Sequence, residues 1–73
     1  MVEFAEKLGK TIKIERIRRD MNQAELAFQA NINQSHLSKI ENGSVNVSVI
    51  MLKRIADVFD CRICDLLVDV DKN

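Results

Sequence analysis

Few residues of this 73-residue chain carry side chains suited to catalysis or metal binding. There is one histidine, His36, and a C-x-x-C pair formed by Cys61 and Cys64. Zinc requires four ligands, so this set falls short of a zinc site. We expect two thiols in or near the core, and a redox switch is the alternative. No nucleophile or carboxylate pair accompanies His36 at a recognisable spacing, so the sequence predicts no enzyme, no metal site and no cofactor.

Charge is balanced overall but is unevenly distributed along the chain. Residues 7–19 hold six basic side chains against Glu15 alone, and residues 57–71 hold five aspartates against Arg62 alone. Such a dipolar domain can present one basic face to phosphate while it stays soluble. An ordinary solvated helix face is the alternative explanation.

The bulk composition predicts one folded domain over residues 1–73. Apolar residues make up 47% and charged residues 30%, which excludes a disordered tail. With no proline and two glycines, the chain lacks the turn residues of an all-β fold. It contains no apolar run long enough to span a bilayer and no signal peptide at the N-terminus, so we expect a cytoplasmic protein with reduced thiols.

Apolar residues recur at helical spacing throughout, which predicts an all-α fold of five helices joined by short turns. We expect helices over residues 2–19, 23–30, 34–42, 49–59 and 62–68. The side chains expected to face inward are Phe4, Leu8, Ile12, Leu26, Ala27, Ala30, Leu37, Ile40, Leu52, Ile55, Ala56, Phe59, Ile63, Leu66 and Leu67. Ile14, Ile17 and Met21 form a second stripe on a neighbouring face of the first helix.

Polar residues at the expected helix ends support these boundaries. Asn22 and Glu25 have the spacing of a capping box, and Asn33 and Ser48 are further N-caps. Gly43 suits the residue after a helix C-terminus. Asp20 and Asp60 are expected in left-handed conformations, which aspartate tolerates better than most residues.

Residues 23–42 read as two short helices separated by a three-residue turn. The small side chain of Ala27 lies where these helices must cross, and it lets their backbones approach closely. Ile32, Leu37 and Ile40 are placed to fill the space beneath the crossing. This combination of residues is far more specific than any one of them.

The segments NQAELA (22–27), LSKIENG (37–43) and IADVF…DLL (55–67) resemble the Xre/Cro family of phage and bacterial repressors. The resemblance covers about residues 8–67. It implies a compact five-helix, lambda-repressor-like DNA-binding domain whose third helix enters the major groove by its N-terminal end. It also implies a buried Arg16–Glu41 pair that ties the first helix to the third.

The resemblance assigns roles to polar residues by position. The side-chain amide of Gln34 can offer adenine one hydrogen-bond donor and one acceptor. The ammonium group of Lys39 can donate to guanine or to a phosphate. The implied base contacts are Gln34, Ser35, Lys39 and, with a lesser role, Ser38. The expected phosphate contacts are Asn22, Gln23, His36, Asn42, Ser44, Asn46 and Arg16.

The chain departs from the family at four places. Positions 20, 31 and 60 often hold glycine in relatives, whereas here they are Asp20, Asn31 and Asp60, which all tolerate the left-handed conformation. The loop GSVNVS (43–48) lacks the usual Lys or Arg. We therefore expect weaker phosphate attraction and a shallower salt dependence than a basic loop would give.

Apolar residues in excess of one small core predict a homodimer, because one such domain contacts only half an operator. Scattered surface hydrophobics are the alternative. The expected interface residues are Val58, Cys64, Leu67, Val68 and Val70. We expect a repressor that binds palindromic double-stranded operator DNA, without a small-molecule ligand. An activator, a restriction–modification controller and an antitoxin or antirepressor that binds another protein remain open.

Overall fold

The computed structural model describes residues 2–68, which form five α-helices. These are α1 (Val2–Arg18), α2 (Gln23–Ala30), α3 (Gln34–Asn42), α4 (Val49–Val58) and α5 (Ile63–Leu67). The expected all-α, five-helix fold is confirmed, and α2 and α3 have the expected bounds. The first and fourth helices end one residue earlier than expected, and α5 is one residue shorter at each end. No helix in residues 2–68 is long and apolar enough to cross a membrane.

Side-chain caps set where the inner helices begin. Asn22 and Glu25 exchange two hydrogen bonds of 2.8 Å, each side chain accepting from the other residue's backbone N–H. The Asn33 carboxamide oxygen accepts from the backbone N–H of Ser35 at 2.9 Å. Ser48 Oγ accepts from the backbone N–H of Met51 at 3.1 Å. The three predicted caps are therefore confirmed, and they satisfy N–H groups that a helix leaves unpaired.

Residues in the left-handed conformation follow the C-terminal ends of the first four helices. Asp20, Asn31 and Asp60 have φ angles of 56°, 57° and 56°, and Gly43 has a φ of 76°. Gly43 is also tightly packed, because a Cβ there would lie 2.6 Å from Glu6 Cα. The aspartates and the asparagine therefore adopt the left-handed conformation at these turns, whereas at position 43 both the conformation and the space require glycine.

The core lies at the centre of the helices and draws on all five. Its largest fully buried side chains are Ile12, Leu26, Leu37, Ile40, Ile55 and Leu66. Ala27 is buried in this core, with 3% of its surface exposed. Ile63 and Leu67 are half-buried and pack against this core.

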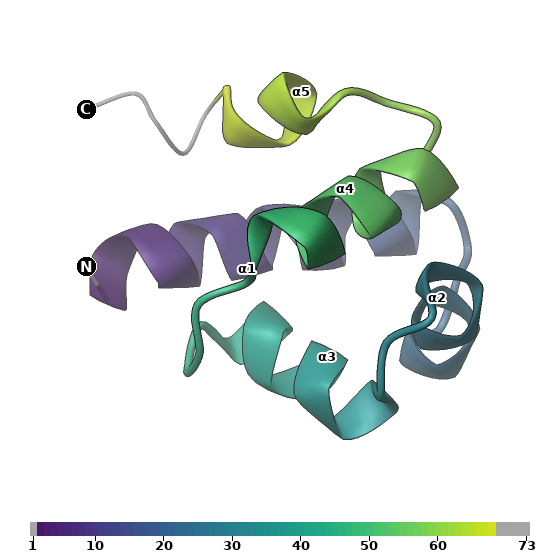
Figure 1. The fold of residues 1–73 in the computed structure, drawn as a ribbon, viewed down its shortest axis with the longest axis horizontal. Coiled ribbons are helices and arrows are strands. Elements are labelled where there is room, and N and C mark those ends of the chain that lie inside the picture. Colours follow the sequence, from purple (N-terminus) through teal and green to yellow (C-terminus); the bar gives the residue numbers. More distant parts are fainter. Residues whose placement is uncertain (1, 69–73) are drawn as a thin grey trace.

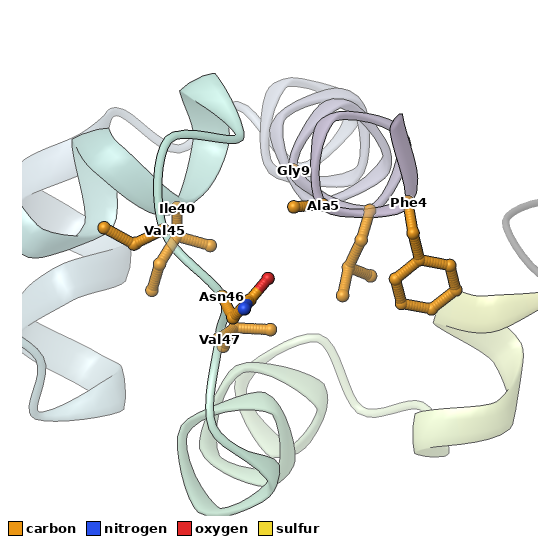
Figure 2. A pocket seen from close by; sticks show the side chains of 8 residues that line it. Phe4, Ala5, Gly9, Ile40, Val45, Asn46 and Val47 are labelled. Carbon is orange, nitrogen blue, oxygen red and sulfur yellow. The ribbon is translucent and has the colours of Figure 1, made fainter. Parts of the chain in front are cut away.

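The prediction that Phe4 faces inward is wrong, because 44% of its surface is exposed. Phe4 lies at the rim of a hollow between the first turns of α1 and the α3–α4 loop, where its side chain is only partly buried (Figure 2). The second stripe of α1 also faces solvent at Ile14 and Ile17, which are 43% and 55% exposed. Only Met21 of that stripe packs against the core.

The arrangement of the helices leaves α3 at one edge of the molecule. Figure 1 shows α3 and α5 on opposite sides, with α1 and α4 between them. Helix α1 contacts both α3 and α5, and α2 packs against α3 and α4. The outer face of α3 is therefore not covered by another described helix.

Candidate nucleic-acid interface

The exposed face of α3 gathers the polar residues expected to read bases. Gln34, Ser35, Ser38 and Lys39 line one open hollow together with Gln23 from the start of α2. Gln34, Ser35 and Lys39 are exposed, whereas Ser38 and Gln23 are half-buried. On the opposite side of α3, Leu37 and Ile40 are 0% and 2% exposed and anchor the helix in the core. The structure thus presents these five polar side chains on one surface.

The cap of α3 engages one of these side chains. Ser35 Oγ donates a hydrogen bond of 2.6 Å to the carboxamide oxygen of Asn33, which also caps the helix. The lone pairs of the hydroxyl stay available, so Ser35 can accept from a base amino group without disturbing the cap. To donate to a base, it would first have to break this bond.

A buried polar network beneath α3 sets its position relative to α1 and α2. Arg16 Nε and Nη2 donate to the two carboxylate oxygens of Glu41 at 2.8 and 3.1 Å. Gln23 Nε2 donates to the same carboxylate at 3.0 Å. The side chains of Arg16 and Glu41 are only 10% and 2% exposed. The implied Arg16–Glu41 pair is therefore present, and Gln23 joins it to the surface hollow.

This burial corrects one expectation about Arg16. Its remaining nitrogen, Nη1, donates to the backbone carbonyl of Met21 at 2.7 Å, so all three guanidinium nitrogens have partners inside the protein. Three of its five N–H groups are thus bound inside the protein, and only 10% of the side chain is exposed to a phosphate. We therefore leave Arg16 out of the phosphate contacts and assign it to the support of α3.

The other expected phosphate contacts surround α3 at three places. Asn22 caps the start of α2, and His36 lies in the first turn of α3. Asn42 is the last residue of α3, and Ser44 and Asn46 lie in the loop that follows it. His36 is half-buried and the other four are exposed. Ser44 Oγ donates to the Lys39 carbonyl at 3.2 Å. The amide of Asn46 points over the hollow between the α3–α4 loop and α1, as Figure 2 shows.

Two cations beside α3 were missed by the sequence reasoning. Lys10 and Lys13 of α1 are exposed and line a second hollow that includes Asn42 at the end of α3. The basic run in residues 7–19 was the available signal. The spacing of these basic residues does not predict which of the six cations faces α3, because that depends on how α1 and α3 cross.

Helix α5 and the end of α4 carry the residues expected at a dimer interface. Val58 and Leu67 are half-buried and pack against the core, Cys64 is exposed, and Val68 is 59% exposed. Val70 lies outside the described residues. Because α5 lies opposite α3, a partner bound there would leave the hollow of α3 open (Figure 1).

The two cysteines lie just before and within α5. Cys61 is half-buried, and burial raises the pKa of its thiol, with the Asp65 carboxylate adding to the effect. A raised pKa keeps the thiol protonated and unreactive near neutral pH. Among residues 2–68, no group of three or more His, Cys, Asp or Glu side chains is placed to hold a metal ion.

Comparison with known proteins points to one family. Residues 12–66 match the helix-turn-helix family. The chain is 30% identical over 71 residues to the control protein C.MunI of Mycoplasma sp, and the match covers 97% of this chain and 92% of that protein.

Solved structures share the fold. The restriction-modification controller protein C.AhdI of Aeromonas hydrophila is 26% identical, with a TM-score of 0.83 over 85% of this chain and 94% of that one. The clp gene regulator ClgR of C. glutamicum is 24% identical, with a TM-score of 0.86 over 93% of this chain and 88% of that one. At that identity, ClgR supports the fold alone.

Proposed function

Because the chain belongs to the Xre-type helix-turn-helix family, we propose that it is a transcription regulator that binds double-stranded DNA through α3. Membership confirms the resemblance to the Xre/Cro repressors. The observation that carries the proposal is the hollow on α3, where Gln23, Gln34, Ser35, Ser38 and Lys39 lie together. An exposed helix with amide, hydroxyl and ammonium groups on one face suits the edges of bases in the major groove.

Each polar residue then has a distinct role. Gln34 reads a base with its amide, and Lys39 donates to guanine or to a phosphate. Ser35 and Ser38 are further base contacts. Gln23 contacts a phosphate at its exposed edge and supports α3 through its hydrogen bond to Glu41. The proposed phosphate contacts are Asn22, Gln23, His36, Asn42, Ser44 and Asn46.

We further propose that the chain binds its operator as a homodimer. The surface around α5, with Val68 exposed and Leu67 half-buried, lies away from the hollow of α3 and presents apolar side chains that a second copy of the chain would cover. Val58 and Cys64 lie in the same region. To bind one duplex, the two copies must place their α3 helices on the same face of the DNA, about 34 Å apart, which is one helical turn.

One observation favours a controller of a restriction–modification system over a phage repressor. C.MunI, named a control protein, matches nearly the full length of the chain, and C.AhdI, described as a restriction-modification controller, shares the fold. A controller acts by binding DNA, so the roles proposed for α3 are the same under either function.

Binding to DNA is tested by fluorescence anisotropy of a labelled duplex of mixed sequence at low salt. The wild-type chain should bind and lose affinity as salt rises, because lysine contacts release counterions from the phosphates. Lys39→Ala should weaken binding. Lys53→Ala is the matched control, since Lys53 pairs with Asp57 at 2.7 Å and lines neither hollow beside α3. A wild-type chain with no affinity for duplex DNA would contradict the proposal.

The homodimer is tested by size-exclusion chromatography with light scattering at micromolar concentration. The wild-type chain should elute with the mass of two copies, and Val68→Glu should shift it toward one. A wild-type monomer at that concentration would contradict the dimer without affecting the proposed contacts of a single subunit with DNA.

A further inference from the structure

The loop that follows α3 lacks the cations that would attract phosphate there. Residues 43–48 read GSVNVS, with no Lys or Arg. A hollow at the end of α3 is lined instead by cations of α1. Lys10 and Lys13 line this hollow with Asn42, and both side chains belong to exposed residues.

The charges around this hollow leave these two lysines largely uncompensated. Glu3 pairs with Lys7 at 3.5 Å, and Glu41 is bound by Arg16 inside the protein. Among residues 2–68, neither Lys10 nor Lys13 forms an ion pair with a carboxylate.

Glu6 is the remaining acidic residue of the lining. Its backbone is held against Gly43 at the end of α3. The two lysines therefore outnumber the unpaired acid, and the hollow keeps a net positive charge.

We propose that Lys10 and Lys13 of α1 bind the phosphodiester backbone of the DNA duplex that α3 reads, beside the phosphate at Asn42. This inference rests on the proposed function and extends its footprint from α3 to α1. The position of the lysines supports it, because they share a hollow with the last residue of α3. The lysines of α1 would then supply the phosphate attraction that the loop lacks.

The consequence is a measurable contribution to the salt dependence of binding. Each lysine that contacts a phosphate should add about 1 to the slope of log affinity against log salt concentration for each subunit. We would measure this slope by anisotropy for the wild-type chain and for Lys10→Ala/Lys13→Ala. The double variant should have a slope smaller by about 2 per bound subunit.

Three further variants sharpen the test. Lys53→Ala removes an exposed lysine of α4 and should leave the slope unchanged. Glu6→Gln should strengthen binding, because it removes the unpaired negative charge beside the two lysines. Lys10→Gln/Lys13→Gln keeps the inner part of each aliphatic stem and a polar end without the charge, and it should reproduce the loss, which distinguishes lost charge from a disturbed fold. Circular dichroism checks that each variant is helical.

The possible results separate this inference from the proposed function. If the wild-type chain binds duplex DNA and the double variant keeps its salt slope, the inference is wrong and the function stands. An equal loss in Lys53→Ala would also overturn it, because the effect would then follow net charge and not position. A wild-type chain that does not bind duplex DNA would overturn both.

Discussion

Arg16 of α1 and Glu41 of α3 form a buried ion pair with two hydrogen bonds, of 2.8 and 3.1 Å. The pair joins residues 25 positions apart in the chain, and Gln23 of α2 donates to the same carboxylate. The orientation of α3 thus depends on a buried polar contact that Gln23 connects to the hollow proposed to face DNA.

Glu41→Gln should lower the free energy of unfolding by about 3–5 kcal/mol, because it leaves the Arg16 charge buried without its carboxylate. Urea denaturation followed by circular dichroism measures the change. Asp57→Asn is the matched control, since Asp57 pairs with Lys53 at the surface, where both side chains are more than half exposed. The control should cost less than about 0.5 kcal/mol. Equal effects of the two substitutions would refute the structural role of the pair.

Gly9→Ala should destabilise the protein although alanine favours helices. A Cβ at position 9 would overlap the carbonyl oxygen of Ile40 and lie 2.8 Å from that of Glu41, so α1 and α3 would have to separate. We expect a net loss of about 1–3 kcal/mol in thermal or urea unfolding.

Helix propensity alone predicts the opposite result for Gly9→Ala, a gain of up to about 1 kcal/mol. Ala24→Gly, on the exposed side of α2, measures the difference in helix propensity between alanine and glycine. It should lower the free energy of unfolding by about 1 kcal/mol. A more stable Gly9→Ala protein would show that α1 and α3 do not approach each other as closely as described.

Asn33→Asp should separate stability from DNA binding. Aspartate caps a helix as well as asparagine does, and its charge interacts favourably with the helix N-terminus, so the melting temperature should stay the same or rise. The added negative charge lies beside Ser35 at the end of α3 that we propose faces DNA, so affinity for duplex DNA should fall, most strongly at low salt.

Asn33→Ala is the comparison for that prediction. It removes the acceptor for the backbone N–H of Ser35 and should cost about 1 kcal/mol of stability without adding charge. If Asn33→Asp binds DNA as tightly as the wild type across all salt concentrations, the start of α3 does not lie near the phosphates or base edges.

Cys61 should react with iodoacetamide only at high pH. Burial and the Asp65 carboxylate raise the pKa of its thiol, so less of the reactive thiolate is present at a given pH. In a Cys64→Ser variant, the alkylation rate should still be rising at the pH where that of free glutathione levels off. A rate that levels off at or below that pH would indicate an activated thiol and would support the alternative that the cysteines form a redox switch.

The helix boundaries around α2 and α3 could be predicted because local chemistry sets them. Asn22, Glu25, Asn33 and Gly43 act on N–H and C=O groups within a few residues of themselves, so their sequence spacing is sufficient. The outward face of α3 could also be predicted from the sequence. Leu37 and Ile40 define the buried side of the helix, so Gln34 and Lys39 must point away from the core.

Features that depend on how helices cross could not be predicted from spacing. The close approach at Gly9 appears only once α1 lies across α3, and the same crossing turns Lys10 and Lys13 toward Asn42. Phe4 illustrates the reverse case. Its i, i+4 spacing with Leu8 indicates burial, but its ring lies at the rim of a hollow. Arg16 could be paired with Glu41 from the family resemblance, yet its burial among three acceptor atoms emerges only from the structure.

The claim that α3 reads DNA sequence is tested most directly by selecting bound duplexes from a random pool. The wild-type chain should return a near-palindrome whose half-sites lie about one helical turn apart. Gln34→Ala should relax one position in each half-site, at a cost of about 1–3 kcal/mol in binding, and Lys53→Ala should return the wild-type sequence. A pool with no preferred sequence, or a preference that Gln34→Ala leaves unchanged at every position, would contradict the account.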